Sequence, residues 1–146
     1  MTMRKRFVIH EHHASRLHFD LRLEIGGVLK SWAVPKGVSM NPADKRLAVH
    51  VPDHALDYID FEGTLAEGTY GAGEVRIWDK GFFETENALE QLQKGKLVFT
   101  FYGAKLKGEF SLVKFWKQEK NWLITKSKDE YADRNWKLET VLEPKK

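Results

Sequence analysis

The segment LHFDLRLEI, residues 17–25, alternates strictly between apolar and polar side chains. Such alternation is typical of a β-strand with one face in the core, because successive side chains point to opposite faces. The polar face carries His18, Asp20 and Arg22, followed by Glu24. Since residues i and i+2 lie about 7 Å apart, His18 and Asp20 can bind one cation between them. An ordinary solvent-exposed face, or a buried histidine–aspartate hydrogen bond, explains the same pattern.

All histidines of the chain fall within its first 54 residues: His10, His12, His13, His18, His50 and His54. His12 precedes His18 by an even number of residues, so it can join the same site from the preceding loop or strand. Imidazole and carboxylate ligands suit a mid-series divalent metal such as manganese, iron or zinc. His18 and Asp20 with His54 would also match the two-histidine, one-carboxylate triad of non-haem iron oxygenases.

Further polar residues fall in loops between the histidines. His54 stands in VPDHALDY, residues 51–58, after a predicted strand, and Lys36, Lys45 and Arg46 lie in or near loops. Arginine and lysine can bind phosphate oxygens, although a solvated surface is their usual environment. With the many aromatic residues, they also allow a non-catalytic nucleic-acid-binding barrel.

Composition narrows the functional classes. The chain has 146 residues, a net charge of +3 and no cysteine, which excludes disulfides, thiolate metal sites and thiol catalysis. The glycine-rich EGTYGAG, residues 67–73, lacks the ending of a phosphate-binding loop, and a strand rather than a helix follows. It predicts a tight loop with positive φ at Gly68, Gly71 or Gly73. Without an apolar membrane span or signal region, a soluble intracellular protein is expected.

The remaining elements are mostly short strands. Alternating patterns predict strands at residues 6–10, 17–25, 28–34, 45–51, 74–79, 96–102, 109–116 and 121–126. We expect turns at Gly26–Gly27 and Lys80–Gly81, an irregular acidic loop over 52–63, a helix from Asn87 to Gly95, and a helical turn at 129–134.

These elements predict a single domain over residues 1–146, with flexible ends at 1–5 and 140–146. The fold class is mainly β, a small closed β-barrel of about eight strands with one or two short flanking helices. A barrel can direct one polar strand face towards the mouth of a cavity.

Several ordered blocks carry a family resemblance: HHASRLHFDLRLE, VLKSWAVPKG, KRLAVHVPDHALDY, FEGTLAEGTYGAGEVRIWD and NWLITKSKDEYA. From about residue 6 to residue 132, the chain resembles the 3′-phosphoesterase module of DNA ligase D, which repairs 3′ ends in prokaryotic end joining. The resemblance implies a small β-barrel and manganese-dependent removal of a 3′-terminal ribonucleoside and of a 3′-phosphate, leaving a 3′-OH. It implies primer-template 3′ ends of DNA or DNA–RNA as partners, a separate ligase and polymerase, a monomer, and action in the cytoplasm at the nucleoid.

The resemblance also assigns residues. It implies that His12, His18 and Asp20 bind Mn²⁺. It also implies that Arg22 and His54 hold the reactive phosphate. Further positions of the family's site match Tyr58, Lys36 and Arg46. The sequence departs from the family at His10 and His13, where glutamine and aspartate are common. This departure leaves open a second metal-binding mode or an altered handling of the terminal nucleoside. The resemblance further implies that residues of an N-terminal extension serve ribonucleoside removal. Only six residues precede Phe7 here, so the phosphatase step is the activity that the matched residues predict.

Overall fold

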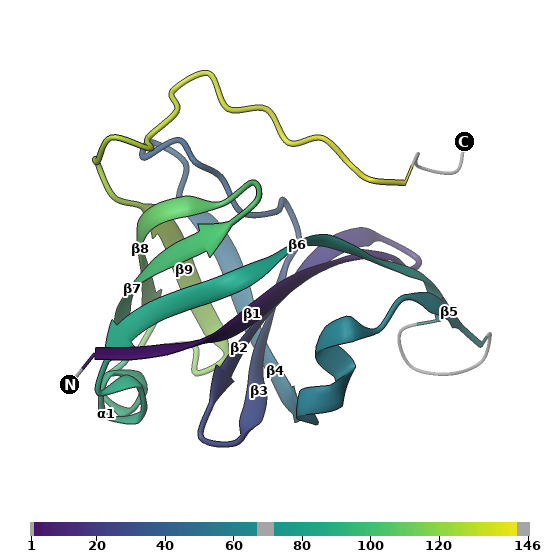
Figure 1. Cartoon of the computed structure of the whole chain (residues 1–146), viewed down its shortest axis with the longest axis horizontal. Coiled ribbons are helices and arrows are strands. Elements are labelled where there is room, and N and C mark those ends of the chain that lie inside the picture. The colour runs from purple at the N-terminus through teal and green to yellow at the C-terminus, as the bar shows by residue number, and fades with distance from the viewer. Residues whose placement is uncertain (1, 67–71, 143–146) are drawn as a thin grey trace.

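The computed structural model describes residues 2–66 and 72–142 and shows a closed, antiparallel β-barrel (Figure 1). Its strands are β1 (Thr2–His13), β2 (Leu17–Ile25), β3 (Val28–Val34), β4 (Arg46–His54), β5 (Gly63–Leu65), β6 (Gly73–Glu86), β7 (Lys96–Gly103), β8 (Lys107–Lys114) and β9 (Asn121–Lys126). Eight of them follow the order β1-β2-β3-β4-β9-β8-β7-β6, and pairing of β1 with β6 closes the barrel. β5 pairs with β6 outside this ring. The predicted small β-barrel is confirmed.

Two short helices accompany the strands. The 3₁₀ helix η1 (Leu56–Asp60) follows β4 directly, and α1 (Ala88–Gln93) lies between β6 and β7. Gly95, with φ of 77°, ends the helical segment as predicted. Asn87 occupies the N-cap position of α1, but its backbone is left-handed and its side chain makes no capping hydrogen bond. The predicted side-chain cap is therefore wrong.

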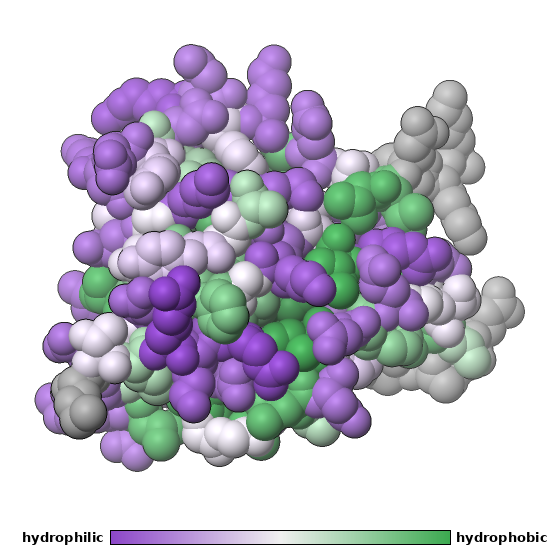
Figure 2. Space-filling model, viewed as in Figure 1, coloured by the Kyte–Doolittle hydropathy of each residue, from purple (hydrophilic) through white to green (hydrophobic). Residues whose placement is uncertain are grey.

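Aromatic and aliphatic side chains fill the barrel interior. The apolar face of β2 belongs to this core, where Phe101 contacts Phe99 and Phe110 with ring centroids 4.8 and 5.1 Å apart. Because side chains alternate along a strand, the polar face of β2 points outwards. The apolar face of β2 thus packs the barrel, as predicted, because Phe19, Leu21, Leu23 and Ile25 all belong to the core. Figure 2 shows one outer face, covered mostly by hydrophilic side chains with some apolar groups between them.

The hairpin between β2 and β3 fixes the register of the polar face. Gly26 and Gly27 have φ of 66° and 82°, the two positive values that a type I′ turn requires. This turn pairs Ile25 with Val28, and therefore Arg22 with Ser31.

Several predicted boundaries are wrong. β1 runs from Thr2, so residues 2–5, expected to be flexible, pair with β6. The predicted acidic loop contains the end of β4 and η1, and β8 ends at Lys114. Residues 129–134 form turns without a helix. The predicted turn at Lys80–Gly81 lies inside the continuous strand β6.

Gly81 has a packing role in place of the expected turn. A Cβ atom at this position would lie 2.2 Å from the carbonyl oxygen of Tyr102 on β7. Glycine therefore allows two strand backbones to approach closely, which is a common reason for glycine within a strand.

After β9 the chain crosses one end of the barrel (Figure 1). Trp136 and Leu138 pack against the core, and the Trp78 indole donates a hydrogen bond to the Glu139 carbonyl at 2.7 Å. Gly68 and Gly71 of the predicted tight loop lie outside the described residues, whereas Gly73 has φ of 135°. No helix within residues 2–66 and 72–142 is long and apolar enough to cross a membrane.

Candidate active site

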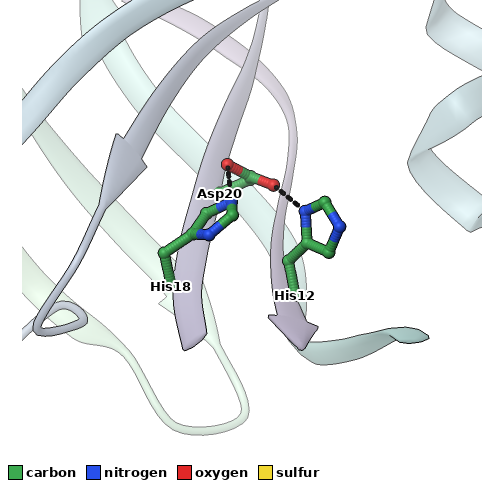
Figure 3. Close-up of side chains that lie close together, drawn as sticks. All are labelled: His12, His18 and Asp20. Carbon is green, nitrogen blue, oxygen red and sulfur yellow. Dashed lines mark hydrogen bonds and ion pairs between the residues drawn. The ribbon is translucent and has the colours of Figure 1, made fainter. Parts of the chain in front are cut away.

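His12, His18 and Asp20 converge on the outer wall of the barrel (Figure 3). The β1–β2 register places His12 directly opposite His18, and Asp20 lies two residues further along β2. The Nδ1 atom of His12 is 3.4 Å from one carboxylate oxygen of Asp20, and the Nε2 atom of His18 is 3.3 Å from the other. One ligand atom from each residue lies within 4.8 Å of the others. Within the described part of the chain, no other histidine, cysteine or carboxylate group of three meets this criterion.

Hydrogen bonding prepares this cluster for a cation. The Nδ1 atom of His18 donates to the Arg16 carbonyl at 3.2 Å, which turns Nε2 towards Asp20 and makes Nε2 the ring nitrogen that can bind a metal there. Burial opposes ionisation of Asp20, but hydrogen bonds from His12 and His18 and the charge of Arg22 hold the pKa of this carboxyl far below its usual range. Two imidazoles and one ionised carboxylate therefore form a donor set that fits a mid-series divalent metal.

Arg22 is buried beside this cluster and is held at each of its nitrogens. Its Nε donates to His10 Nδ1 at 3.1 Å, and its Nη1 donates to the Ser31 hydroxyl at 2.9 Å. Nη1 also donates to His54 Nδ1 at 3.0 Å, and Nη2 to Asp20 at 3.4 Å. Burial lowers the pKa of Arg22, and the Asp20 carboxylate opposes this effect. The guanidinium thus joins the His12–His18–Asp20 cluster to His54.

The end of β4 and the start of η1 bring His54 and Tyr58 to the site. Their rings lie 4.6 Å apart, and the Arg22 guanidinium carbon lies 5.0 Å from the Tyr58 ring centroid. Burial and the positive charge of Arg22 lower the pKa of His54. Burial raises the pKa of Tyr58, so its hydroxyl keeps its proton. Next to the His12–His18–Asp20 cluster, the site therefore presents a cation, a neutral imidazole and a hydroxyl donor.

Two predicted residues are not brought into these contacts. Lys36 is exposed in the turn after β3 and, among the described residues, forms no hydrogen bond or ion pair with the site. Arg46 is the cross-strand partner of Ile124, whose side chain lies in the barrel core. Arg46 therefore lies on the inner face of β4, opposite to the face that carries the site. Its guanidinium contacts Asp44 at 3.4 Å.

The other polar residues have separate environments. His13 contacts Glu11 at 2.7 Å, His50 stacks on Trp32, and Glu24 pairs with Arg6. The triad expected for an iron oxygenase does not form, because His12 rather than His54 completes the cluster with His18 and Asp20.

The site also contains residues that the sequence interpretation missed. Ser31 is buried against Arg22, and the Arg16 carbonyl orients His18. Ser31 had a signal in the sequence, because a two-residue hairpin turn at Gly26–Gly27 implies that it lies opposite Arg22. His10 was identified only as a departure from the family.

Fold and site together define a β-barrel protein whose outer wall places three potential metal ligands beside a buried arginine, an arrangement suited to phosphate esters. Residues 10–114 match the model of the DNA Ligase D 3′-phosphoesterase domain, and the chain belongs to this family.

Curated relatives extend this result. The chain is 49% identical over 127 residues to the multifunctional non-homologous end joining protein LigD of Pseudomonas aeruginosa, a match covering 85% of this chain and 15% of the relative. It is 46% identical over 132 residues to the protein of the same name from Mycolicibacterium smegmatis, covering 86% and 17%. The LigD DNA repair protein of Mycobacterium tuberculosis is 45% identical over 108 residues, covering 74% and 14%. The chain thus spans at most 17% of the length of these relatives.

Proposed function

We propose that this chain is a metal-dependent phosphoesterase that heals the 3′ ends of DNA or DNA–RNA primer-templates in non-homologous end joining. It hydrolyses a 3′-phosphate to a 3′-OH and, in a second activity, removes a 3′-terminal ribonucleoside. The observation that carries the proposal is the contact between the His12–His18–Asp20 cluster and Arg22. Family membership supports the reaction class.

We further propose Mn²⁺ as the cofactor and a monomer that works in the prokaryotic cytoplasm, at the nucleoid. Separate polymerase and ligase activities would fill and seal the healed end. Two imidazoles and a carboxylate suit Mn²⁺. When bound by His12, His18 and Asp20, the metal would supply Lewis-acid polarisation of the phosphoryl group and lower the pKa of a bound water.

The chain's own groups would then manage charge and protons. Arg22 offsets negative charge on the phosphate oxygens as it develops in the transition state. Since His54 Nδ1 accepts from Arg22, the neutral imidazole carries its proton on Nε2, from which it can bond a phosphate or leaving-group oxygen. Tyr58 adds a second neutral donor.

Incubation with Mn²⁺ and three primer-templates, ending in 3′-phosphate, 3′-ribonucleotide or 3′-OH, tests the proposal. We expect inorganic phosphate from the first, loss of the terminal ribonucleoside from the second, and no change in the third. The reaction should proceed without oxygen or a keto acid, which an iron oxygenase would require. No product from either modified end would contradict the proposal.

A pair of variants separates catalysis from binding. Asp20→Ala should abolish phosphate release while keeping much of the DNA affinity, because dispersed cationic contacts dominate affinity for nucleic acid. Asp57→Ala removes an exposed carboxylate of η1 and should remain active. Near-normal turnover by Asp20→Ala would exclude the metal site and favour a non-catalytic nucleic-acid-binding barrel.

A further inference from the structure

His10 is completely buried on the outer face of β1. It lies between Asp20 on β2 and Tyr58 of η1. Its cross-strand partner is Asp20, but its ring reaches diagonally to Arg22, where Nδ1 accepts the Nε hydrogen at 3.1 Å. The Tyr58 ring meets it edge-on, with centroids 5.3 Å apart. His10 is therefore enclosed by the groups proposed to act on phosphate.

The contact with Nε determines how the guanidinium is turned. Arginine has five N–H donors in one rigid plane, so fixing the Nε direction also fixes both terminal nitrogens. Ser31 and His54 accept from Nη1, and Asp20 accepts from Nη2. With His10 in place, the two terminal nitrogens face His54 and Asp20. Without the hydrogen bond to His10, the direction of Nε would no longer be fixed.

We propose that His10 is a positioning residue, which directs the Arg22 guanidinium towards the reactive phosphate through a neutral imidazole and does not bind the metal. This inference rests on the proposed function. A second carboxylate in this place, in addition to Asp20, would offset the positive charge of Arg22 further, whereas a neutral acceptor holds the guanidinium without reducing its charge.

Two observations support this assignment. The Arg22 guanidinium can only donate, so the His10 nitrogen that lies 3.1 Å from its Nε must present a lone pair, and the ring accepts this hydrogen bond as a neutral imidazole. Its Nδ1 lone pair is already used by Arg22, and the cluster of potential ligands in the described residues consists of His12, His18 and Asp20.

Two substitutions test the role of His10. His10→Gln keeps a neutral acceptor, whereas His10→Leu removes it at similar volume. We expect His10→Leu to lower kcat/KM for a 3′-phosphate primer-template about 10- to 100-fold, since the lost hydrogen bond involves a charged group. His10→Gln should restore most of this loss. Mn²⁺ affinity should stay within about twofold of wild type in both variants, whereas His12→Gln should weaken it.

The effect should also depend on Arg22. In an Arg22→Ala background, His10→Leu should cause no further loss, because a residue that acts through Arg22 has nothing left to position. His50→Leu, which alters a histidine stacked on Trp32 away from Arg22, is the matched control and should leave kcat/KM unchanged.

Three results would overturn the proposal: weaker Mn²⁺ binding by His10→Leu, an undiminished effect of His10→Leu without Arg22, or full activity of His10→Leu. If His10→Leu does not fold, the same comparisons use His10→Gln and His10→Asn, with thermal unfolding as a check. If the wild type releases no phosphate, the proposed function fails. Affinities for Mn²⁺ and inorganic phosphate then decide the His10 assignment by themselves.

Discussion

Arg22 connects the two parts of the site. It contacts Asp20 of the proposed metal site on one side and His54 of the proposed phosphate site on the other, and it lies over the Tyr58 ring. A buried arginine with four polar partners has little freedom to rotate, so it offers phosphate a preorganised charge. The loss of Arg22 should therefore affect the chemical step more than the fold of the barrel.

Arg22→Ala should lower the rate of phosphate release on the order of 100-fold or more while Mn²⁺ still binds, because all three metal ligands remain. Arg22→Lys keeps the charge but loses the planar fork, so its rate should fall between those of the wild type and Arg22→Ala. Single-turnover phosphate release and a parallel Mn²⁺ titration measure the two effects. Loss of Mn²⁺ binding in Arg22→Ala would show that the arginine supports the metal cluster itself.

At the level of elements, a buried lysine joins the end of β9 to β8. The Lys126 ammonium is fully enclosed and donates to the carbonyls of Glu109 and Ser127 and to Asp129 at 2.5 Å. Asp129 also accepts backbone hydrogen bonds from Glu109 and Tyr131. This network fixes the first turn of the chain that crosses the barrel end. Its stability should depend on the charge of Asp129.

Burial raises the pKa of Asp129, but the hydrogen bond from Lys126 and the two backbone donors outweigh it, so the pKa lies below its usual value. The unfolded state therefore binds the proton more tightly, and Asp129 stabilises the fold above its unfolded pKa of about 4. This contribution is lost as the pH falls through the folded pKa. The difference in unfolding free energy between wild type and Asp129→Asn should thus shrink from pH 5 to pH 2, as measured by urea titrations. A difference that stays constant over this range would contradict the role of the Asp129 charge. Asp57→Asn is the matched control.

At the level of the whole molecule, Glu11 links the two ends of the described chain. It is buried near the end of β1, next to the proposed metal ligand His12, and accepts the backbone hydrogens of Val141 and Leu142 at 2.7 and 2.8 Å. His13 contacts the same carboxylate. The C-terminal segment is therefore attached to β1, the strand that carries His12 of the proposed metal site.

Glu11→Gln should lower the free energy of unfolding by about 1–3 kcal/mol, because an amide has one acceptor oxygen where the carboxylate uses two. Hydrogen exchange at Val141 and Leu142 should accelerate, while Glu130→Gln, at an exposed site, should change neither quantity. Unchanged exchange at both amides would argue against attachment through Glu11. Mass-spectrometric exchange and chemical denaturation provide the two measurements.

Local patterns in the sequence were sufficient for the strand at 17–25, its hairpin at Gly26–Gly27 and the β-barrel class. These features depend on side-chain alternation and on turn chemistry, which act between neighbours along the chain. The same alternation predicted that His18, Asp20 and Arg22 share one face. The metal-ligand and phosphate-binding assignments of single residues stay predictions, and the resemblance supplied more of them than spacing did.

Long-range pairing decided the rest. Lys80–Gly81 reads as a turn locally, but pairing of β6 with β1 and β7 extends the strand through it, and glycine allows the close approach to Tyr102. His10 could be placed on Arg22 only after the β1–β2 register was known, since a strand register depends on the partner strand. The sequence by itself thus determined which residues share a face, and tertiary structure decided which faces meet. Contacts between distant strands result from closing the barrel, which no local segment encodes.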